Sequence, residues 1–238
     1  MLIVIDIETT GVDLEDRILS LGVINIDKKE YRYEVVNEGK KVSTKASSVH
    51  QITNDERKEA VSFDMSQINQ YLQEYNTTEN ILVAHNLDFT LMMLQRSGFV
   101  WLGETISTQR VTKHLVSECE EFSLAFLHYE LQLYKQLQEE YALFGIKDAL
   151  HMHNALGDAV IVKLLFDYHN ELQSIESLID LTQKNVLLTQ FDFGKYKGKF
   201  IEEIAYNDKN YLEWAFFNMH DLDEDMKYTL EYYLQGVS

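Results

Sequence analysis

Proline is absent from this chain of 238 residues, and cysteine occurs once, as Cys119. A single cysteine excludes an intrachain disulfide and a thiolate-rich zinc cluster, and it suits a reducing compartment. Without proline, no rigid linker or proline-initiated turn marks a domain boundary. The sequence also lacks an apolar run of about 20 residues, the length that spans a membrane, and its N-terminal apolar run lacks the flanks of a signal peptide. We therefore expect a cytoplasmic protein without a membrane segment.

Basic residues are also scarce. The chain has 21 lysines and arginines against 39 aspartates and glutamates, so its formal net charge is −18 at pH 7. This balance argues against a protein that binds nucleic acid through a broad phosphate-neutralising surface. A polyanionic substrate must therefore be held locally. The acidic surface is also compatible with an unidentified protein partner.

Hydrophobic patterns predict five strands. The first begins with the apolar residues 2–5, residues 18–26 and 30–36 form a hairpin around a short polar turn, and residues 81–84 and 104–108 are two further strands. A meander of three strands, followed by strands with crossover helices, implies an α/β fold with a mixed sheet covered by helices.

Helical periodicity is expected between and after these strands. The expected helices are residues 54–61, capped by Thr53, then 65–75, a stretch from about residue 90, 122–133 and 154–172, the longest. After residue 181, aromatic residues become frequent around one basic loop that contains glycine. We therefore expect a main domain at residues 1–180 and a small module at residues 187–238.

Asp6 and Glu8 lie at the end of the first predicted strand, in the run Asp-Ile-Glu-Thr-Thr-Gly. Side chains two positions apart in a strand project from the same face. Two like charges side by side are unfavourable unless a cation lies between them, and hard divalent ions prefer carboxylate oxygens. One interpretation is therefore a metal site. The other is an edge strand with a solvated acidic face before a Thr-Gly turn.

Two further segments carry groups suited to catalysis. The run Val-Ala-His-Asn-Leu-Asp-Phe-Thr at 83–90, the second segment, ends a strand and starts a helix, where sites in such sheets gather. The run at 153–158 opens the longest predicted helix. Within one helix His153 and Asp158 would lie about 140° apart, so both reach one site only if Asn154 caps the helix after His153. Taken singly, His153 can be a surface histidine and Asp158 a charge that favours the helix N-terminus.

Together these runs resemble the DEDDh superfamily of 3′-to-5′ exonucleases. The matching residues are 6–11, Ala-His-Asn at 84–86 and His-Asn-Ala-Leu-Gly-Asp-Ala at 153–159. Residues 48–53, Ser-Val-His-Gln-Ile-Thr, resemble that family's His-x-Ile-Thr loop. The likeness extends over the chain to about residue 170. It implies a ribonuclease H-like fold, in which a mixed five-stranded sheet is flanked by helices and followed by a small C-terminal module.

The C-terminal part is similar to the corresponding module of the bacterial exodeoxyribonuclease X family. The matching runs are Phe-Asp-Phe-Gly-Lys-Tyr-Lys-Gly-Lys at 191–199 and Asn-Tyr-Leu-Glu-Trp at 210–214. Lysines beside glycines and an aromatic ring suit phosphate contacts and base stacking. Lys195, Lys197 and Lys199 are therefore candidate nucleic-acid contacts, although a tight turn with solvated lysines has the same composition.

The resemblance implies hydrolysis of the terminal phosphodiesters of DNA to nucleoside 5′-monophosphates, in DNA repair. Asp6, Glu8 and Asp158 would hold one Mg²⁺ or Mn²⁺, Asp6 would bridge to a second ion, and His153 would be the general base. The residues that would contact the nucleic-acid 3′ end are Thr9, Thr10, Gly11, His50 and Asn86. Because the protein is acidic, we expect modest affinity and short-tract or distributive digestion.

The second segment departs from the family pattern. Counting from Asn86, the family's second-motif aspartate falls on Thr90, which offers a hydroxyl but no charge. Asp88 is the candidate that could act instead as the catalytic carboxylate and ligand of the second ion, or it could cap the helix or be solvated. Two other functions therefore stay open. One is an RNA-trimming relative with the same metals, and the other is a binding protein that kept the fold and lost its chemistry.

Overall fold

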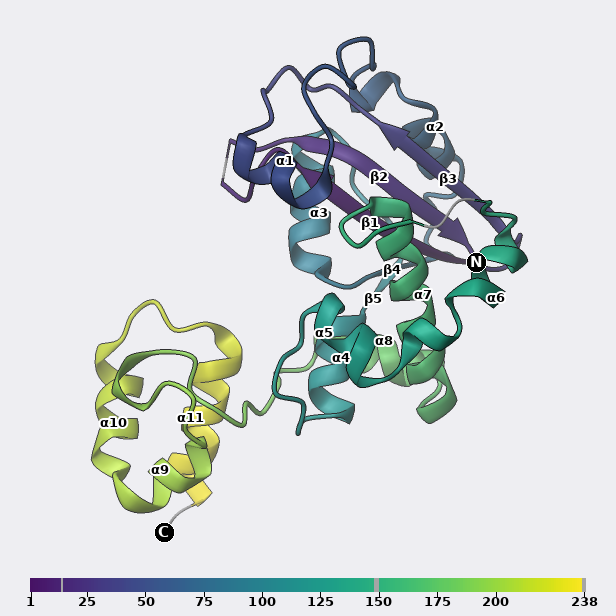
Figure 1. Ribbon diagram of the computed structural model, residues 1–238. Coiled ribbons are helices and arrows are strands. Elements are labelled where there is room, and N and C mark those ends of the chain that lie inside the picture. The colour runs from purple at the N-terminus through teal and green to yellow at the C-terminus, as the bar shows by residue number, and fades with distance from the viewer. Residues whose placement is uncertain (14, 148–149, 237–238) are drawn as a thin grey trace.

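A mixed sheet with helices on both faces, followed by a helical module, makes up the computed structural model, which describes residues 1–13, 15–147 and 150–236 (Figure 1). The strands are β1 (Leu2–Thr9), β2 (Ile18–Asn25), β3 (Glu30–Val35), β4 (Ile81–Ala84) and β5 (Glu104–Ser107). Their order across the sheet is β3-β2-β1-β4-β5. β1, β2 and β3 are antiparallel, whereas β4 runs parallel to β1, and β5 to β4. The predicted strands and mixed sheet are confirmed.

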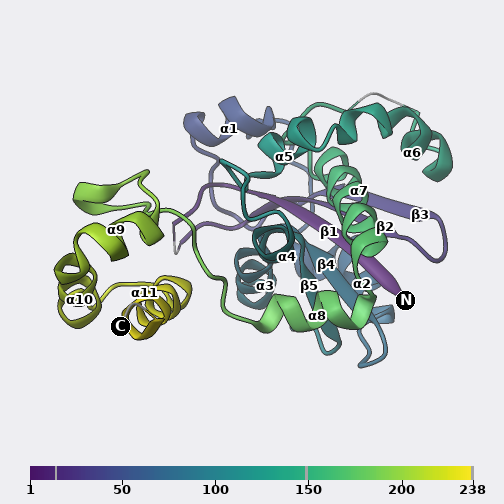
Figure 2. The ribbon, with the colours of Figure 1, turned by 90° about the horizontal axis from the view of Figure 1, so that it is seen from below.

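Helices cover the two faces of the sheet. The helices of the main domain are α1 (Thr44–His50), α2 (Gln67–Glu74), α3 (Leu87–Arg96), α4 (Thr108–Leu115), α5 (Leu124–Glu130), α6 (Leu137–Phe144), α7 (Ala155–Leu172) and α8 (Ile175–Gln183), with 3₁₀ turns at Phe63–Met65 and Leu133–Lys135. Ile3, Ile5 and Ile7 of β1 pack in a core with α2 and α3, whereas Val4 packs in a second core with α7. Figure 2 shows α7 on one side of β1 and α2 on the other. Successive residues of β1 therefore serve opposite layers.

The predicted helix at residues 54–61 is wrong, because residues 54–59 form successive turns. Thr53 and Glu56 do make the reciprocal bonds of a helix cap: Thr53 N donates to Glu56 Oε2 (2.7 Å) and Glu56 N to Thr53 Oγ1 (3.3 Å). The segment is mostly exposed and offers no apolar face, and a short helix needs tertiary packing to persist. Helices α1, α4, α6 and α8, each at most nine residues long, have no counterpart among the predicted helices.

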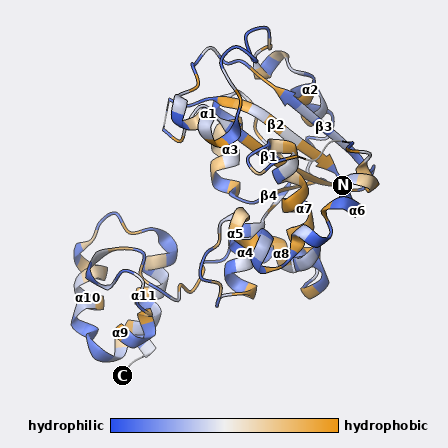
Figure 3. Cartoon of the chain, viewed as in Figure 1, coloured by the Kyte–Doolittle hydropathy of each residue, from blue (hydrophilic) through white to orange (hydrophobic). Residues whose placement is uncertain are grey.

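The C-terminal module consists of α9 (Ile201–Asn207), α10 (Lys209–Asn218), α11 (Glu224–Gly236) and a 3₁₀ turn at Gly194–Tyr196. Its hydrophobic core contains Phe191, Leu212 and Leu230 and is separate from both cores of the main domain. Figure 3 shows hydrophobic residues concentrated in β1, β2 and α7, whereas the helices of the module carry many hydrophilic residues. No helix among the described residues is long and apolar enough to cross a membrane.

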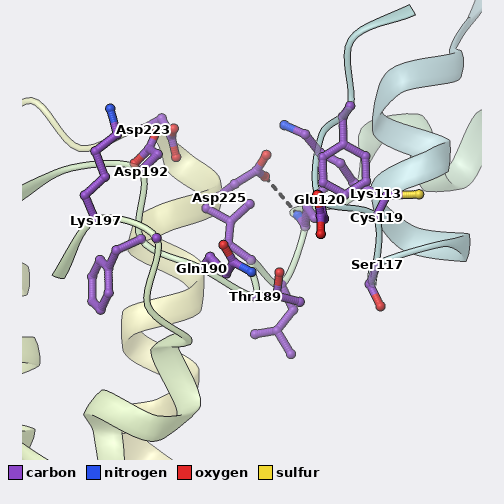
Figure 4. A pocket seen from close by; sticks show the side chains of 16 residues that line it. Lys113, Ser117, Cys119, Glu120, Thr189, Gln190, Asp192, Lys197, Asp223 and Asp225 are labelled. Atoms are coloured by element: carbon purple, nitrogen blue, oxygen red, sulfur yellow. Dashed lines mark hydrogen bonds between the residues drawn. The ribbon is translucent and has the colours of Figure 1, made fainter. Parts of the chain in front are cut away.

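Arg110 on α4 and Asp225 on α11 join the module to the main domain. The guanidinium donates to both carboxylate oxygens of Asp225 (2.9 and 3.1 Å). It also donates to the carbonyl oxygen of Thr182 at the end of α8 (3.0 Å) and to that of Lys184 in the connecting segment (2.6 Å). Asp225 accepts a further hydrogen bond from the N–H of Val186 (2.9 Å), drawn as a dashed line in Figure 4. One buried ion pair therefore fixes the connecting segment against both parts.

A cavity of about 350 Å³ lies at this junction, and Figure 4 shows the side chains that line it. The main domain contributes Lys113 and Glu120 to its lining, and the module contributes Asp192, Lys197 and Asp223. Acidic and basic side chains are therefore mixed in its wall. The cavity does not form the continuous positive surface that attracts nucleic acid.

Candidate active site

Asp6 and Glu8 project from the face of β1 that α7 covers. Ile5 and Ile7, which alternate with them, point into the core on the opposite face. This alternation follows from the pleat of a strand. The two carboxyl groups are electrostatic neighbours, as the sequence predicts, and Asp158 is the next charge beside them.

The start of α7 brings His153 and Asp158 to these carboxyl groups. Asn154 caps the helix, because its Oδ1 accepts hydrogen bonds from the N–H groups of Leu156 (3.1 Å) and Gly157 (3.2 Å). His153 precedes the cap in a left-handed conformation (φ 62°), and its N–H donates to Asp158 Oδ2 (3.0 Å). The structure therefore places His153 in the loop before the helix, where both side chains can face one site.

Gly22 on β2 allows α7 to lie this close to the sheet. It is paired with Asp6 across the β1–β2 ladder. A Cβ atom at residue 22 would lie 2.2 Å from the carbonyl oxygen of Ala155 and 2.4 Å from Cα of Leu156. The first turn of α7 would have to move away to accept it. Gly22 is a residue of the site that the motifs did not identify. Its signal is a glycine inside an otherwise β-branched and apolar strand, which often marks a close backbone approach.

Burial raises the pKa of three carboxyl groups at this point, and repulsion by neighbouring acids adds to the rise for Asp6 and Glu8. Burial and the charge of Asp158 raise the pKa of Glu8 to about 8. Burial raises the pKa of Asp158 to about 7, although the hydrogen bond from the His153 N–H opposes this rise. The pKa of Asp6 is raised well above its usual value by burial and by the charges of Asp158 and Glu8. The fold thus holds three acids together at a cost in free energy that a bound cation would remove.

The residues of this cluster fit a divalent cation. Ligand atoms of Glu8, His153 and Asp158 lie within 4.8 Å of one another. Asp158 Oδ1 is buried and has no hydrogen-bond partner among the described residues, whereas buried polar oxygens are normally paired. Carboxylate oxygens are the ligands that Mg²⁺ and Mn²⁺ prefer. The donor set, the unpaired oxygen and the raised pKa values all suit a metal ion between β1 and α7.

Asp88 does not join this cluster. Among the described residues, the group with metal-ligand spacing consists of Glu8, His153 and Asp158. Asp88 is exposed in the first turn of α3. It lines a polar hollow of about 590 Å³ together with Arg110 and residues of the C-terminal module. The structure therefore gives no support to Asp88 as the substitute carboxylate.

Thr90 occupies the inner face of α3. It is buried, at 4% exposure, and shares that face with Leu87, Met93 and Leu94. Asn86 is the residue before the helix and is exposed, beside the polar hollow that Asp88 lines. Thr90 therefore faces the interior of the protein, whereas Asp88 faces solvent.

The loop after β1 is held together by its own side chains. Thr9 Oγ1 donates to the carbonyl oxygen of Gly11 (2.6 Å), and Thr10 Oγ1 donates to Asp16 Oδ1 (2.7 Å). Asp16 also pairs with Lys40 (2.8 Å), and a Cβ atom at residue 11 would lie 2.4 Å from Asp16 Oδ2. Both threonine hydroxyls are thus engaged within the loop. A contact from these residues to nucleic acid would have to use their backbone groups.

His50, the last residue of α1, lies beside His153. Burial and the charge of His153 lower the pKa of His50. Its Nδ1 accepts a hydrogen bond from the N–H of Ile52 (3.1 Å), so the proton of the neutral ring is on Nε2. Nε2 is buried without a hydrogen-bond partner among the described residues. The loop resembling His-x-Ile-Thr therefore reaches the general-base candidate, and a substrate contact by His50 stays a prediction.

Tyr33 of β3 also borders the cluster, and the sequence motifs did not identify it. Its side chain is 38% exposed and lies near Glu8 and the helix cap Asn154. Burial raises the pKa of the phenol. The alternating pattern of β3 gives no sign that Tyr33 borders the site, because Glu8 and Asn154 belong to other parts of the chain.

The three lysines of the tail loop, residues 194–199, have different surroundings. Lys195 forms an ion pair with Asp208 (3.0 Å), and its ammonium lies 4.6 and 5.0 Å from the centres of two tyrosine rings. Lys197 and Lys199 are exposed. Lys195 therefore stabilises the module itself, whereas Lys197 and Lys199 are more accessible to a phosphate.

Two family models match this sequence. The one described as Exonuclease matches residues 3–166, and the one described as Exodeoxyribonuclease X-like C-terminal matches residues 191–219. Two relatives, both named Exodeoxyribonuclease 10, come from Escherichia coli K12 and Escherichia coli O6:H1. Each is 30% identical over 242 residues, with 100% of this chain and 100% of the relative covered.

Solved structures share the fold. Exonuclease X in complex with 5′ overhanging duplex DNA superimposes with a TM-score of 0.60 at 22% identity, over 76% of this chain and 99% of that one. The nuclease domain of 3′hExo, a DEDDh family member bound to rAMP, gives a TM-score of 0.52 at 14% identity, over 74% and 94%. At these identities the likeness concerns the fold. It confirms the ribonuclease H-like α/β arrangement that the sequence predicts.

Proposed function

Since the chain belongs to the exonuclease family, we propose that it removes nucleoside 5′-monophosphates from the 3′ end of DNA in a reaction that requires divalent metal ions. The observation that carries this proposal is the cluster of Glu8, His153 and Asp158, with ligand atoms within 4.8 Å of one another. Asp6, beside them, is the fourth group of the site. The proposed direction of digestion rests on the resemblance of these residues to the DEDDh pattern.

The residues of the cluster have distinct proposed roles. Asp6, Glu8 and Asp158 would hold a divalent ion, which when bound would supply positive charge to the scissile phosphate and polarise a water molecule. His153 is the general base, because its imidazole lies in an exposed loop beside the acids, where it can accept a proton from the attacking water. The hydrogen bond from the His153 N–H to Asp158 fixes the backbone that carries this base.

The protein has a net charge of −18 and can still bind a polyanionic substrate if it holds that substrate at one local site. The bound metal would place positive charge at one point, while most of the surface repels phosphate. We therefore expect weak overall attachment and distributive or short-tract digestion. Single-encounter measurements that show removal of hundreds of nucleotides would contradict this expectation.

DNA is the proposed substrate because both full-length relatives are named exodeoxyribonucleases and one structural neighbour holds duplex DNA. A role in DNA repair inside the cytoplasm is proposed on the same basis. We further propose that residues 1–180 and 187–238 are separate domains, and that Lys197 and Lys199 of the second domain help to orient the DNA end. Deleting residues 187–238 without a change in DNA affinity would remove that last role.

The test is degradation of a 5′-labelled oligonucleotide by the metal-free full chain to which Mg²⁺ or Mn²⁺ is added. Matched DNA and RNA strands distinguish the proposed activity from RNA trimming. The ladder should shorten from the 3′ end with DNA, and Glu8→Gln should abolish it. If the wild-type chain releases no nucleotide from either strand with either ion, the proposal is wrong.

A further inference from the structure

We propose that this chain binds one divalent ion, and not two, as long as no nucleic acid is bound, because Thr90 stands where a second ion would need a carboxylate. The inference rests on the proposed nuclease function of the Glu8, His153 and Asp158 cluster. It adds a property particular to this chain, the number of ions that the free protein holds.

Thr90 is fixed in place by the helix that carries it. Its N–H donates to the carbonyl oxygen of Asn86 (3.0 Å), so it belongs to the first hydrogen-bonded turn of α3. It is 4% exposed, and the face it shares with Leu87 and Leu94 packs in the core that contains Ile7 of β1. The side chain at position 90 is therefore held inside the protein, and it is a neutral hydroxyl.

Asp88 cannot take over from position 90 while α3 remains a helix. Two helical positions apart correspond to a rotation of about 200°, so Asp88 projects from nearly the opposite side of α3. The structure agrees, because Asp88 is exposed and lines the polar hollow of about 590 Å³ with Arg110 and Asp223. The charge missing at Thr90 is not replaced from this helix.

The remaining charges favour a single ion. Asp6, Glu8 and Asp158 lie close together and carry three negative charges when ionised, so they repel one another. One divalent ion removes most of this repulsion. Among the residues that the structure describes, a second ion would have Asp6, which the first ion already uses, and the hydroxyl of Thr90. Ions with so few carboxylate ligands are usually held together with substrate phosphates. The second ion would therefore bind only when a phosphate of the nucleic acid supplies the missing charge.

The experiment counts ions on the metal-free full chain without nucleic acid. Titration with Mn²⁺, followed by calorimetry and by electron paramagnetic resonance, should give one ion per wild-type chain with the spectrum of an isolated ion. Thr90→Asp should bind two ions, with the altered spectrum of a coupled pair. Thr90→Val, which keeps the shape of the side chain without its hydroxyl, and Asp88→Asn should both still bind one.

Each outcome bears on the inference. Two ions of similar affinity on the wild-type chain overturn it, and so does loss of the ion in Asp88→Asn. If Thr90→Asp does not fold because it buries a fourth acid, the counts for the wild type, Thr90→Val and Asp88→Asn decide alone. Two bound ions together with cleavage of DNA would overturn this inference but support the proposed function. One bound ion without cleavage would support this inference but contradict the proposed function. No Mn²⁺ on the wild type overturns both.

Discussion

The region between the end of β1 and the start of α7 differs in its charged groups from the first turn of α3. On the β1–α7 side, Asp6, Glu8 and Asp158 are crowded together, and the pKa of each is raised. On the α3 side, the inward position is the neutral Thr90, and the only acid of the first turn, Asp88, faces solvent. One half of the site is built at a cost in stability, and the other half is not.

This difference shows which part of the site needs a ligand to be stable. Acids that are wholly or partly buried destabilise a fold when no counter-charge is present, so a chain that keeps three of them together is suited to a cation at that point. A neutral, buried threonine makes no such demand. Substitutions on the two sides should therefore change catalysis, metal binding and stability in different directions.

The largest effect is expected for the general base. His153→Ala should lower the rate of nucleotide release by roughly 10²–10⁴, because a positioned base contributes about that much. The metal count should hardly change if the acids are the main ligands. His220→Ala, an exposed histidine of the C-terminal module, is the matched control and should keep full activity. Near-normal turnover by His153→Ala would show that another group accepts the proton.

A similarly large loss is expected when the two layers are forced apart. Gly22→Val puts side-chain atoms where the backbone of Ala155 and Leu156 lies, so α7 must shift and carry Asp158 away from Asp6. Both DNA cleavage and Mn²⁺ binding should fall, together with the melting temperature. Gly236→Ala, where a Cβ atom meets nothing within 4 Å, should change none of these. Wild-type Mn²⁺ affinity in a folded Gly22→Val protein would contradict the proposed packing.

Metal binding and stability should be linked on the acidic side. The folded pKa of Glu8 is raised to about 8 and that of Asp158 to about 7. A raised folded pKa gives stability that is fully present below the unfolded value and is lost as the pH rises through the folded value. The metal-free protein should therefore melt at a lower temperature at pH 8 than at pH 5 as far as these groups are concerned. Mn²⁺ should restore several degrees at pH 8.

Glu8→Gln is the variant that separates stability from function in this experiment. It removes one buried charge, so the metal-free variant should melt higher than the metal-free wild type at pH 8. It should also gain less from Mn²⁺. If metal-free Glu8→Gln keeps its fold but melts below the metal-free wild type at pH 8, the ionised carboxylate stabilises the free protein. That result would contradict the proposed repulsion among the acids.

A smaller, opposite dependence on pH is expected from two buried histidines beside α4. Burial lowers the pKa of His85 to about 4 and that of His169 to about 3. A depressed histidine pKa means that the unfolded chain binds protons first, so stability is lost as the pH falls below about 6.5. Each histidine should contribute a slope on the order of 1.4 kcal/mol per pH unit below that value.

His169→Gln tests this slope. The Nε2 of His169 lies 3.0 Å from Thr112 Oγ1, and a glutamine amide can make the same bond without titrating. The free energy of unfolding, measured in urea from pH 7 to pH 5, should fall less steeply in this variant. An unchanged slope would mean that other groups cause the acid destabilisation.

The smallest effect is expected in the tail loop. Lys197→Gln with Lys199→Gln should weaken DNA binding a few-fold and reduce its salt dependence, because each lost phosphate contact lowers that dependence by about one unit. Lys195→Gln should instead lower the stability of the module, since it breaks the ion pair with Asp208. Equal salt dependence in the double variant and the wild type would remove these lysines from the DNA surface.

Much of the site follows from local rules. The strand pleat puts Asp6 and Glu8 on one face whatever they pack against, and the capping preference of Asn154 decides that α7 begins after His153. The same local reasoning failed at residues 54–61. There the capping bonds of Thr53 and Glu56 form, but no apolar face is available to hold a helix against the core.

Local rules could not decide whether Asp88 or Thr90 faces the interior of the protein. Both positions were compatible with a helix starting near residue 90. The observed start of α3 at Leu87 and the burial of Leu87 and Leu94 turn Thr90 inward and Asp88 outward. Nor could they show that Arg110 would pair with Asp225 across the two parts of the chain. Such a contact depends on how separate elements pack.

The sequence by itself determined where the strands lie along the chain, that Asp6 and Glu8 share one face, and the position of His153. Each of these depends on backbone geometry over a few residues. Only the tertiary structure decided which acids share one environment. The contact of α7 with Gly22 brings Asp158 to β1, and the packing of α3 leaves Asp88 outside. Burial and distance between layers set the pKa values and the metal site, and neither is a property of a short segment.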